Sequence, residues 1–589
     1  MDDLNKITYF AETDSRGKRV PFGIKNGDRS KHAYVIGKSG MGKSTLLENM
    51  AIQDIQSGNG ICFIDPHGGT ATKLLEYVPE DRIKDVLYFA PFDMEYPVSF
   101  NIMEDVGADK RHLVVNGLMS VFEKIWEDAW SARMAYILQN TLLALLEFPG
   151  ATLLAVNRMY TDKAFRQRVV DNVTDISVKS FWVEEYAKYT DKYASEATPA
   201  IQNKIGQFAG NPLIRNIIGQ PKSSFDIRKI MDEKKIMIVN LSKGRVGEGN
   251  ARLLGSMFIT KIYLAAMSRA DESATSLAKL PPFYLFVDEF QSFADKSFAD
   301  ILSEARKYKL CLTMAHQYIE QMEEEVRDAV FGNVGTMIAF RVGAYDADVL
   351  EKEFAPVFNA EDLVNLGLRQ IYLKLMIDSV TSQPFSATTL PPIQPQATMY
   401  VDEIIEHSRA GFSKPRSVVE QEIVDWHAVG KDEAKSPSAL SGTKMTPYVP
   451  KKEPKPIDIR NNAEKQARDR DVRDMTQPNP PKPEPRPAPK NPTPAPKIRI
   501  EPLPANKKVS LESLNKKTDN QRKPDEKHVS ALRDALKAVV KEPLEKKPET
   551  SSMEQKANYE PKSTPAPKSA ESRPTGPTPE DLRKILHGE

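Results

Sequence analysis

The chain has 589 residues, 40% of them hydrophobic, so it is long enough for several domains with substantial cores. Its 82 basic and 81 acidic residues leave a formal net charge of +1, which excludes a strong overall attraction to nucleic acid or membrane. The two cysteines, Cys62 and Cys311, lie in apolar runs without metal-site spacing, and we expect buried free thiols in a reducing compartment.

The amino terminus, MDDLNKITYF, lacks the charged and then apolar layout of a signal peptide. The most apolar long stretch, 136–156, is interrupted by polar residues and a proline, which argues against a membrane span. We therefore expect a cytoplasmic chain without a transmembrane segment.

Residues 31–430 alternate between short apolar runs and helical patterns, which is typical of a parallel sheet covered on both faces. The expected strands lie at 33–37, 60–65, 85–90, 235–241, 283–289, 310–315, 335–340 and 371–377. Between 105 and 228 amphipathic helical patterns replace the strand signals. The prediction is an α/β domain formed by 31–104 and 229–430, an all-α domain (105–228) inserted into it, and an extension (1–30) packed on it.

A nucleotide-binding loop is predicted directly after the first of these strands. The run Gly37, Lys38, Ser39, Gly40, Met41, Gly42, Lys43, Ser44 satisfies the pattern GxxxxGK[ST], and a helical pattern begins at Thr45. Glycines let backbone N–H groups turn inward around phosphates, and the following helix adds its partial positive charge. Lys43 is expected to reach the β- and γ-phosphates of ATP, and the Ser44 hydroxyl to ligate Mg²⁺.

Polar residues also follow other strands of the predicted sheet. Asp65 ends the second strand and could orient a Mg²⁺-bound water or the loop itself, whereas His67 is interpreted as part of a turn because no second ligand lies at metal-site spacing. Lys243 and Arg245 follow a later strand in a glycine-containing loop, which suits contact with DNA phosphates but equally a solvated loop.

The sequence FYLFVDEF supplies the second half of a nucleotide site, an apolar strand that ends in acidic residues. Asp288 is placed to hold the Mg²⁺ shell, and Glu289 to act as the general base that activates a water. An ordinary strand capped by acidic residues is the alternative. Beside a complete phosphate loop, the pair indicates hydrolysis rather than a slow switch.

A γ-phosphate sensor and an arginine finger are expected near the next strand. Gln317 follows the strand 310–315, and a polar side chain there faces the ligand crevice of a parallel sheet. Arg306 precedes that strand and is the candidate for a finger supplied to a neighbouring subunit, with a solvated helical arginine as the alternative. Arg215 and Arg341 are weaker candidates for the same role.

Composition changes sharply near residue 430. More than half of the 43 prolines lie in 431–589, while every Trp and Phe precedes that segment, so we expect a disordered tail. Two short helical patterns, at 528–540 and 579–589, are either transient helices or docking motifs for partners that the sequence does not identify.

The ordered set GIKNGDRSKHAYVIGKSGMGKST, FIDPHGG, NLSKGRVGE, LFVDEFQSFA, SEARKY, TMAHQY and FRVGAYDAD resembles the FtsK–HerA superfamily of DNA-pumping ATPases, over residues 5 to 430. Within it, the chain is most similar to type IV secretion coupling proteins of the TraG/TraD type. The resemblance implies a RecA-like P-loop NTPase domain, a homo-hexameric ring and DNA in a central channel. By position, Lys43 and Ser44 match its Walker A motif and Asp288 and Glu289 its Walker B motif. Gln317 matches its third motif, and Arg306 its arginine finger.

Coupling proteins of this type usually carry amino-terminal transmembrane helices, and this sequence shows none. We therefore expect either docking at the inner face of the membrane, on a separate membrane or secretion-channel subunit, or a free translocase. The leading hypothesis is an ATP-driven translocase of DNA or nucleoprotein. A secretion ATPase acting on proteins and a nucleotide-controlled recruitment scaffold are the alternatives.

Overall fold

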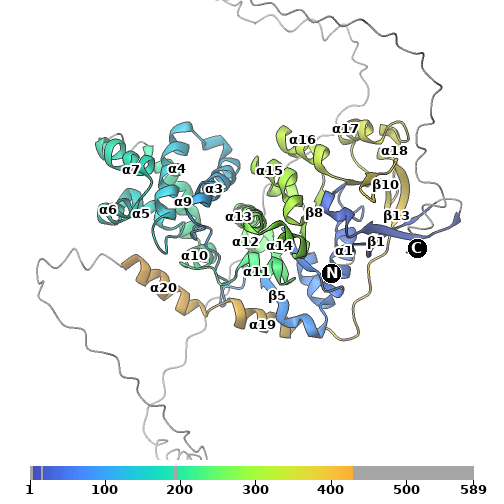
Figure 1. Cartoon of the computed structure of the whole chain (residues 1–589), viewed down its shortest axis with the longest axis horizontal. Helices are drawn as coiled ribbons and strands as arrows, with labels where there is room; N and C mark the ends of the chain where they lie inside the picture. The colour runs from blue at the N-terminus through green and yellow to red at the C-terminus, as the bar shows by residue number, and fades with distance from the viewer. Residues whose placement is uncertain (1–3, 15–16, 191–192, 194–196, 429–589) are drawn as a thin grey trace, which may run out of the picture. The chain divides into compact units, whose positions relative to one another are not determined.

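The computed structural model describes residues 4–14, 17–190, 193 and 197–428. The predicted tail at 431–589, with its two helical patterns, lies outside the described residues. The described part belongs to one compact unit, and Figure 1 shows its helices and strands. Cys62 and Cys311 are both buried and free.

One 11-stranded sheet organises this unit, with strand order β2-β1-β13-β10-β9-β3-β8-β7-β4-β6-β5. From β9 to β5 all neighbours are parallel, and β10, β13, β1 and β2 add an antiparallel extension at one side. Its strands are β1 (Ile7–Thr13), β2 (Pro21–Lys25), β3 (Ala33–Ile36), β4 (Gly60–Asp65), β5 (Val86–Phe89), β6 (Ile236–Asn240), β7 (Phe283–Val287), β8 (Leu310–His316), β9 (Thr336–Ala339), β10 (Gln370–Lys374) and β13 (Phe385–Thr389). The short pair β11 (Met376–Ile377) and β12 (Val380–Thr381) forms a separate two-stranded sheet.

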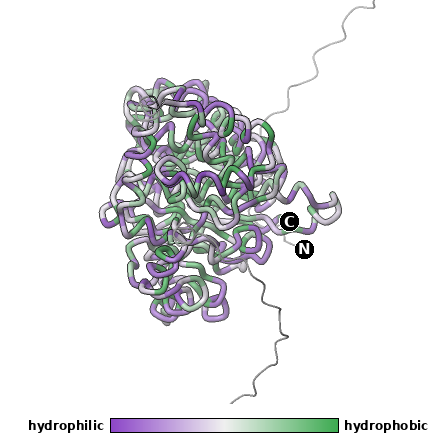
Figure 2. The backbone as a smooth tube through the Cα atoms, turned by 90° about the vertical axis from the view of Figure 1, so that its left-hand side faces the viewer, coloured by the Kyte–Doolittle hydropathy of each residue, from purple (hydrophilic) through white to green (hydrophobic). Residues whose placement is uncertain are grey.

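The parallel strands are mostly apolar because both faces of the sheet are covered. In β3, Tyr34 and Ile36 enter the hydrophobic core on one face and Val35 enters the core on the other. Helix α13 (Glu248–Met267) packs in the first core, and α1 (Lys43–Gln56) packs in the second. Figure 2 shows hydrophobic segments inside the fold and hydrophilic ones toward its outer turns. The predicted fold class, an α/β architecture with a parallel-rich sheet, is confirmed.

The remaining helices of the α/β part lie mostly at crossovers and at the carboxyl-terminal end. They are α2 (Gly69–Leu74), α11 (Ile227–Asp232), α12 (Lys243–Val246), α14 (Ala274–Lys279), α15 (Ser297–Glu304), α16 (Glu324–Asn333), α17 (Ala344–Phe354), α18 (Ala360–Val364), α19 (Val401–Phe412) and α20 (Arg416–Ala428). Among the described residues, no helix combines the length and apolar character needed to cross a bilayer.

Only helical elements are described between β5 and β6. They include α3 (Arg111–Ile125), α4 (Ala132–Leu146), α5 (Ala155–Thr161), α6 (Lys163–Asn172), α7 (Ile176–Ser180), α9 (Pro199–Gly210) and α10 (Pro212–Ile218). We call residues 105–228 the helical segment. The pair α19 and α20 joins it to the sheet, since α19 packs beside β5 and α20 beside α10 (Figure 1). Trp426 of α20 also contacts Phe165 of α6, with ring centroids 5.9 Å apart.

The structure differs from the expected strands at three places. The amino-terminal extension contributes β1 and β2 to the main sheet, where β1 pairs with β13. No expected strand covered β13. The single strand expected at 371–377 divides into β10 and β11, which belong to different sheets.

Candidate active site

The predicted phosphate loop connects β3 to α1 at the carboxyl edge of the sheet. Gly42 has φ 117°, a left-handed conformation that favours glycine, and directly precedes the helix. A Cβ on Gly37 would lie 2.5 Å from Cβ of Phe340, so the loop needs a glycine there. The backbone N–H of Lys38 donates to the carbonyl of Arg341 at 2.8 Å, which anchors the loop to the end of β9.

Lys43 and Ser44 follow Gly42. Lys43 points back toward the loop, and Ser44 points toward the end of β7. Lys43 Nζ donates to the carbonyl oxygens of Gly37 at 2.6 Å and Lys38 at 3.3 Å. Burial lowers the pKa of the Lys43 ammonium, and the charges of Glu289 and Asp288 oppose that shift. This arrangement suits a phosphate because a desolvated ammonium lies beside inward-turned backbone at a helix amino terminus.

The rest of the loop lies in the same region. Ser39 and Gly40 are exposed, and Met41 and Thr45 are half-buried, with Thr45 in the first turn of α1. The Met41 carbonyl accepts a hydrogen bond from the backbone N–H of Arg369 at 3.3 Å.

Asp288 and Glu289 directly follow β7, two strands away from β3 in the sheet. The Ser44 hydroxyl donates to Oδ2 of Asp288 at 3.0 Å. Burial raises the pKa of Asp288 to about 6, and Glu289 adds to the rise, whereas Ser44 lowers the pKa. Hydroxyl and carboxylate oxygens are ligands that Mg²⁺ prefers, so this pair fits a magnesium ion at the end of β7.

Gln317 and Glu289 meet directly, although they follow different strands. Gln317 Nε2 donates to Oε1 of Glu289, and the Ser39 hydroxyl donates to Oε1 of Gln317 at 2.9 Å. Gln291 Nε2 donates to the second carboxylate oxygen of Glu289 at 2.6 Å. The structure thus joins the phosphate loop, the expected sensor and the expected base in one chain of hydrogen bonds.

The backbone of Glu289 adopts φ 49°, ψ 47°, a left-handed conformation that is uncommon for a residue with a side chain. Strain of this kind costs on the order of 1–3 kcal/mol and gathers at functional sites. Here it turns the chain immediately after Asp288, so that consecutive carboxylates contact Ser44 and Gln317 respectively.

Arg306 lies away from the site of its own chain. It is exposed in the short helix Ala305–Tyr308 before β8, whereas Gln317 follows the other end of that strand. Seven residues of strand span ~23 Å, so Arg306 cannot join Gln317 within one chain.

The two weaker arginine candidates occupy different places. Arg215 belongs to α10 in the helical segment, near Glu420 of α20. Arg341 lies two residues after β9, and its backbone carbonyl accepts a hydrogen bond from the N–H of Lys38 in the phosphate loop.

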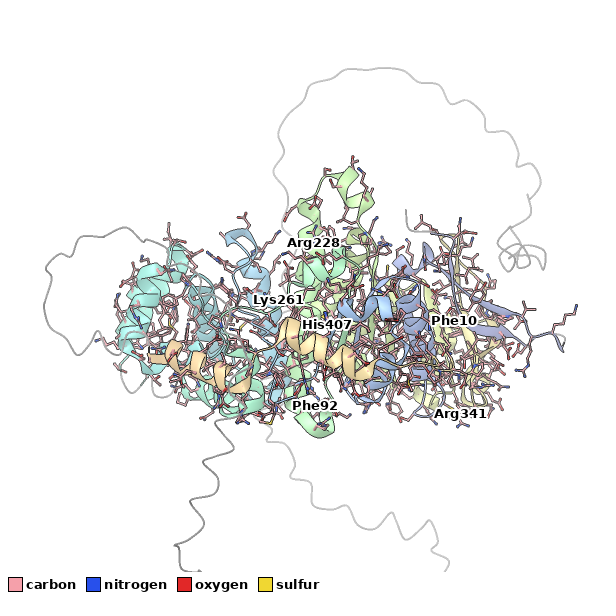
Figure 3. All side chains as sticks on the ribbon, turned by 90° about the horizontal axis from the view of Figure 1, so that it is seen from below. Phe10, Phe92, Arg228, Lys261, Arg341 and His407 are labelled. Carbon is pink, nitrogen blue, oxygen red and sulfur yellow. The ribbon has the colours of Figure 1, made fainter. Side chains whose placement is uncertain are left out.

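Asp65 orients its own turn. Its two carboxylate oxygens accept hydrogen bonds from the backbone N–H groups of His67 at 2.7 Å and Ala71 at 2.9 Å. Lys243 and Arg245 were the candidates for contact with DNA phosphates. Lys243 lines a cavity of about 520 Å³ together with His67, Glu289 and Gln317. The guanidinium of Arg245 lies 3.6 Å from the ring centre of Phe92, which follows β5 (Figure 3).

Sequence reasoning missed Arg369 beside the phosphate loop. A Cβ on Gly42 would lie 3.9 Å from Cγ of Arg369, which has φ 63° just before β10. Gln291, the second partner of Glu289, was also missed. The VDEFQ run contains Gln291, but its contact depends on the turn at Glu289, which no sequence pattern specifies.

Comparison with known families finds a match to the sequence model described as Type IV secretory system Conjugative DNA transfer, over residues 6–334. Comparison with curated proteins finds no match.

Several solved structures are similar to this chain. An unbound bacterial conjugative coupling protein, TrwBdeltaN70, is 15% identical with TM-score 0.47, over 65% of this chain and 90% of that chain. The plasmid coupling protein TrwB in complex with ADP and Mg²⁺ is 15% identical with TM-score 0.48, over 67% and 98%. VirB4 of Thermoanaerobacter pseudethanolicus is 14% identical with TM-score 0.41, over 67% and 97%.

The family model matches more than half of the chain, from before β1 to the end of α16, and it includes the phosphate loop, the acidic pair and Gln317. The chain therefore belongs to the conjugative DNA transfer family of type IV secretory systems.

Proposed function

We propose that this protein is an ATP-hydrolysing ring motor that moves DNA or nucleoprotein in type IV conjugative transfer. One observation carries the proposal. The hydrogen-bonded chain from Ser39 through Gln317 to Glu289 lies beside the Ser44–Asp288 pair, in a chain that belongs to the conjugative DNA transfer family.

Each residue has a distinct part in this proposal. The loop 37–45 binds the phosphates of ATP, with Lys43 on the β- and γ-phosphates, while Ser44 and Asp288 hold Mg²⁺. Magnesium supplies neutralisation of the phosphate charge. Glu289 accepts a proton from the attacking water, and Gln317 orients that water or the γ-phosphate.

Arg306 completes the site from a neighbouring subunit in this proposal. Its exposed position outside its own site suits a finger that stabilises charge at the γ-phosphate of the next chain. A homo-hexamer with DNA in its channel, docked on a membrane or secretion-channel subunit at the cytoplasmic face, is the assembly that we infer from the family. A ring lets a chain of near-neutral net charge concentrate a few cations around DNA.

The decisive experiment measures the ATPase rate of the full chain with double-stranded DNA, with single-stranded DNA, with a protein substrate and without addition. Oligomer size is measured on the same sample. Strong stimulation by DNA, abolished in Glu289→Gln, is the expected result. Stimulation by protein alone would favour a protein-secretion ATPase, and absence of turnover under every condition would favour a scaffold. Turnover that survives Glu289→Gln would refute the assignment of the base.

A further inference from the structure

Lys124, in the last turn of α3, contacts both segments that follow the proposed catalytic side chains. Its Nζ donates a hydrogen bond to the carbonyl of Ala294, in the loop after Glu289. The same Nζ lies 4.0 Å from Oε1 of Glu323, in the segment after Gln317. Its side chain is only 17% exposed. One ammonium of the helical segment thus contacts both segments that follow the expected base and sensor.

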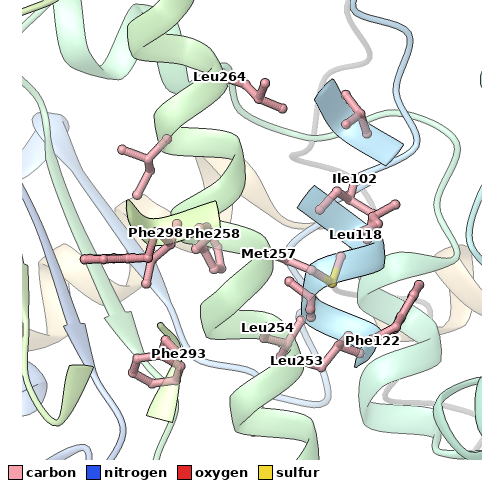
Figure 4. Close-up of a cluster of buried hydrophobic side chains, with 14 of the residues drawn as sticks. Ile102, Leu118, Phe122, Leu253, Leu254, Met257, Phe258, Leu264, Phe293 and Phe298 are labelled. Carbon is pink, nitrogen blue, oxygen red and sulfur yellow. The ribbon is translucent and has the colours of Figure 1, made fainter. Parts of the chain in front are cut away.

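Helix α3, which carries Lys124, packs closely on α13 and is held in place by this contact. A Cβ on Gly117 of α3 would lie 2.4 Å from Cγ2 of Thr260 in α13, which shows how near the two helices approach. Figure 4 shows Leu118 of α3 beside Met257 of α13, with Phe122 farther along α3. All three side chains are buried.

The opposite side of α13 packs on the loop after Glu289. A Cβ on Gly255 would lie 2.3 Å from the Phe293 ring, and the Ser256 hydroxyl donates to the Phe293 carbonyl at 3.1 Å. Figure 4 shows Phe293 and Phe298 across α13 from Phe122. Because cores of this density transmit strain, we expect a displacement of α3 to reach the loop through α13.

The cavity of about 520 Å³ brings these parts next to the chemistry. Lys124 and Glu127 line it from the helical segment, and Glu289 and Gln317 line it from the strand ends. Lys124 therefore lies in the same cavity as the two proposed catalytic side chains, and it contacts the segment that follows each of them.

We propose that Lys124 is a positioning residue for ATP hydrolysis, through which the helical segment sets the relative placement of Glu289 and Gln317. This inference rests on the proposed function. The inference adds that the rate of ATP turnover depends on the position of the helical segment. Misplacement of a catalytic group by about 1 Å can cost two orders of magnitude in rate, so one contact is enough for such control.

The test compares Lys124→Met and Lys124→Arg in the full chain. Methionine keeps the apolar stem without the charge, and arginine restores it. We expect Lys124→Met to lower kcat about tenfold with KM and the Kd of a fluorescent ATP analogue within twofold of wild type, and Lys124→Arg to recover most of kcat. Unchanged kcat in Lys124→Met, or a parallel loss of nucleotide binding, would overturn the proposal.

Lys296→Met is the matched control, because Lys296 forms an exposed ion pair with Glu123 (3.2 Å) between the same two elements. Exposed pairs contribute little, so wild-type kcat is expected. Glu323→Gln removes the other partner of Lys124 and carries the test if Lys124→Met fails to fold. It should lower kcat in the same direction, and an unchanged rate there contradicts the proposal.

The fluorescence of Trp126 distinguishes a positioning role of Lys124 from a purely structural one. It is buried two residues after Lys124 and stacks on Phe122 with centroids 4.6 Å apart. Its emission, obtained as wild type minus Trp126→Phe, should change when a non-hydrolysable ATP analogue binds, and this change should vanish in Lys124→Met. An equal change in both proteins would contradict the proposal.

The proposed ATPase function and the proposed role of Lys124 can be refuted independently of each other. If Glu289→Gln retains turnover, the proposed function is wrong. If Glu289→Gln abolishes turnover while Lys124→Met leaves it intact, only the role of Lys124 is wrong.

Discussion

The Ser44 hydroxyl donates a hydrogen bond to the Asp288 carboxylate at 3.0 Å across a sequence separation of 244 residues. The helical segment and the strands β4, β5, β6 and β7 lie between them in the chain, yet β3 and β7 are separated in the sheet only by β8. Both residues therefore lie at the same carboxyl edge, where parallel strands bring their ligand-binding ends.

Ser44→Ala should abolish the tightening of ATP binding by Mg²⁺, because it removes one of two proposed oxygen ligands. The measurement is the Kd of a fluorescent ATP analogue with Mg²⁺ and with EDTA, and the ratio should fall at least tenfold. Ser39→Ala is the control, since Ser39 bonds Gln317 rather than Asp288 and should keep the ratio. An unaltered ratio in Ser44→Ala would contradict the metal site.

Gln317→Ala should lower kcat on the order of 100-fold with little change in the Kd of ATP, because its partner is the proposed base. Steady-state kinetics and equilibrium binding on one preparation separate the two quantities. Gln321→Ala, at another position lining the same cavity, should behave as wild type. A loss of binding that equals the loss of kcat would assign Gln317 to ground-state binding instead.

Mixing two inactive variants should restore ATPase activity if Arg306 acts in trans. In a mixed ring, the Arg306→Ala subunit still has Glu289, and the Glu289→Gln subunit still has Arg306. An interface that combines these two residues is therefore complete. ATPase rate against mixing ratio should pass through a maximum, whereas each variant alone stays inactive. Lys307→Ala, which alters a neighbouring exposed residue, is expected to retain activity. A flat mixing curve would count against the trans assignment.

Gly255→Ala should destabilise the protein by about 1–3 kcal/mol, because its Cβ would overlap the buried Phe293 ring. Gly249→Ala, in the same helix with open space around its Cα, should instead gain up to about 1 kcal/mol from the higher helix propensity of alanine. Urea unfolding of both variants measures the two effects. Equal stabilities would show that α13 does not press on Phe293.

Acid should destabilise the fold partly through His32, which is fully buried before β3 and accepts a hydrogen bond from the Leu312 backbone N–H at Nδ1 (3.1 Å). Burial lowers its pKa to about 4, and Arg306 and Lys31 add to the fall. The folded state therefore takes up fewer protons than the unfolded state, whose histidine pKa is about 6.5. The stability from neutral His32 is complete above that value and is lost as pH falls toward 4.

His32→Asn keeps an acceptor for Leu312 but cannot titrate in this range. Between pH 7.5 and 4.5 the variant should lose about 2–3 kcal/mol less unfolding free energy than wild type. Urea unfolding at the two pH values measures the difference, and His407→Asn, at an exposed position, should follow wild type. Equal losses in wild type and His32→Asn would contradict a buried neutral histidine.

The parallel strands were predictable because they are continuous apolar runs, such as FYLFV in β7, buried on both faces. The antiparallel extension was not predictable from the sequence, because its strands are partly polar and form only by pairing with distant segments. FSATT in β13 is flanked by β1 and β10, and its pairing with β1 spans most of the described chain. Local pattern carries no information about such a partner.

By itself, the sequence determined the phosphate loop and the acidic strand end, because each depends on residues adjacent in the chain. Only the tertiary structure decided what these residues meet. It placed Gln317 on Glu289, Ser44 on Asp288 and Lys124 between Ala294 and Glu323, and it placed Arg306 at the far end of β8. Those relations follow from strand order and helix packing, which arise from contacts between distant segments and leave no periodic trace in the chain.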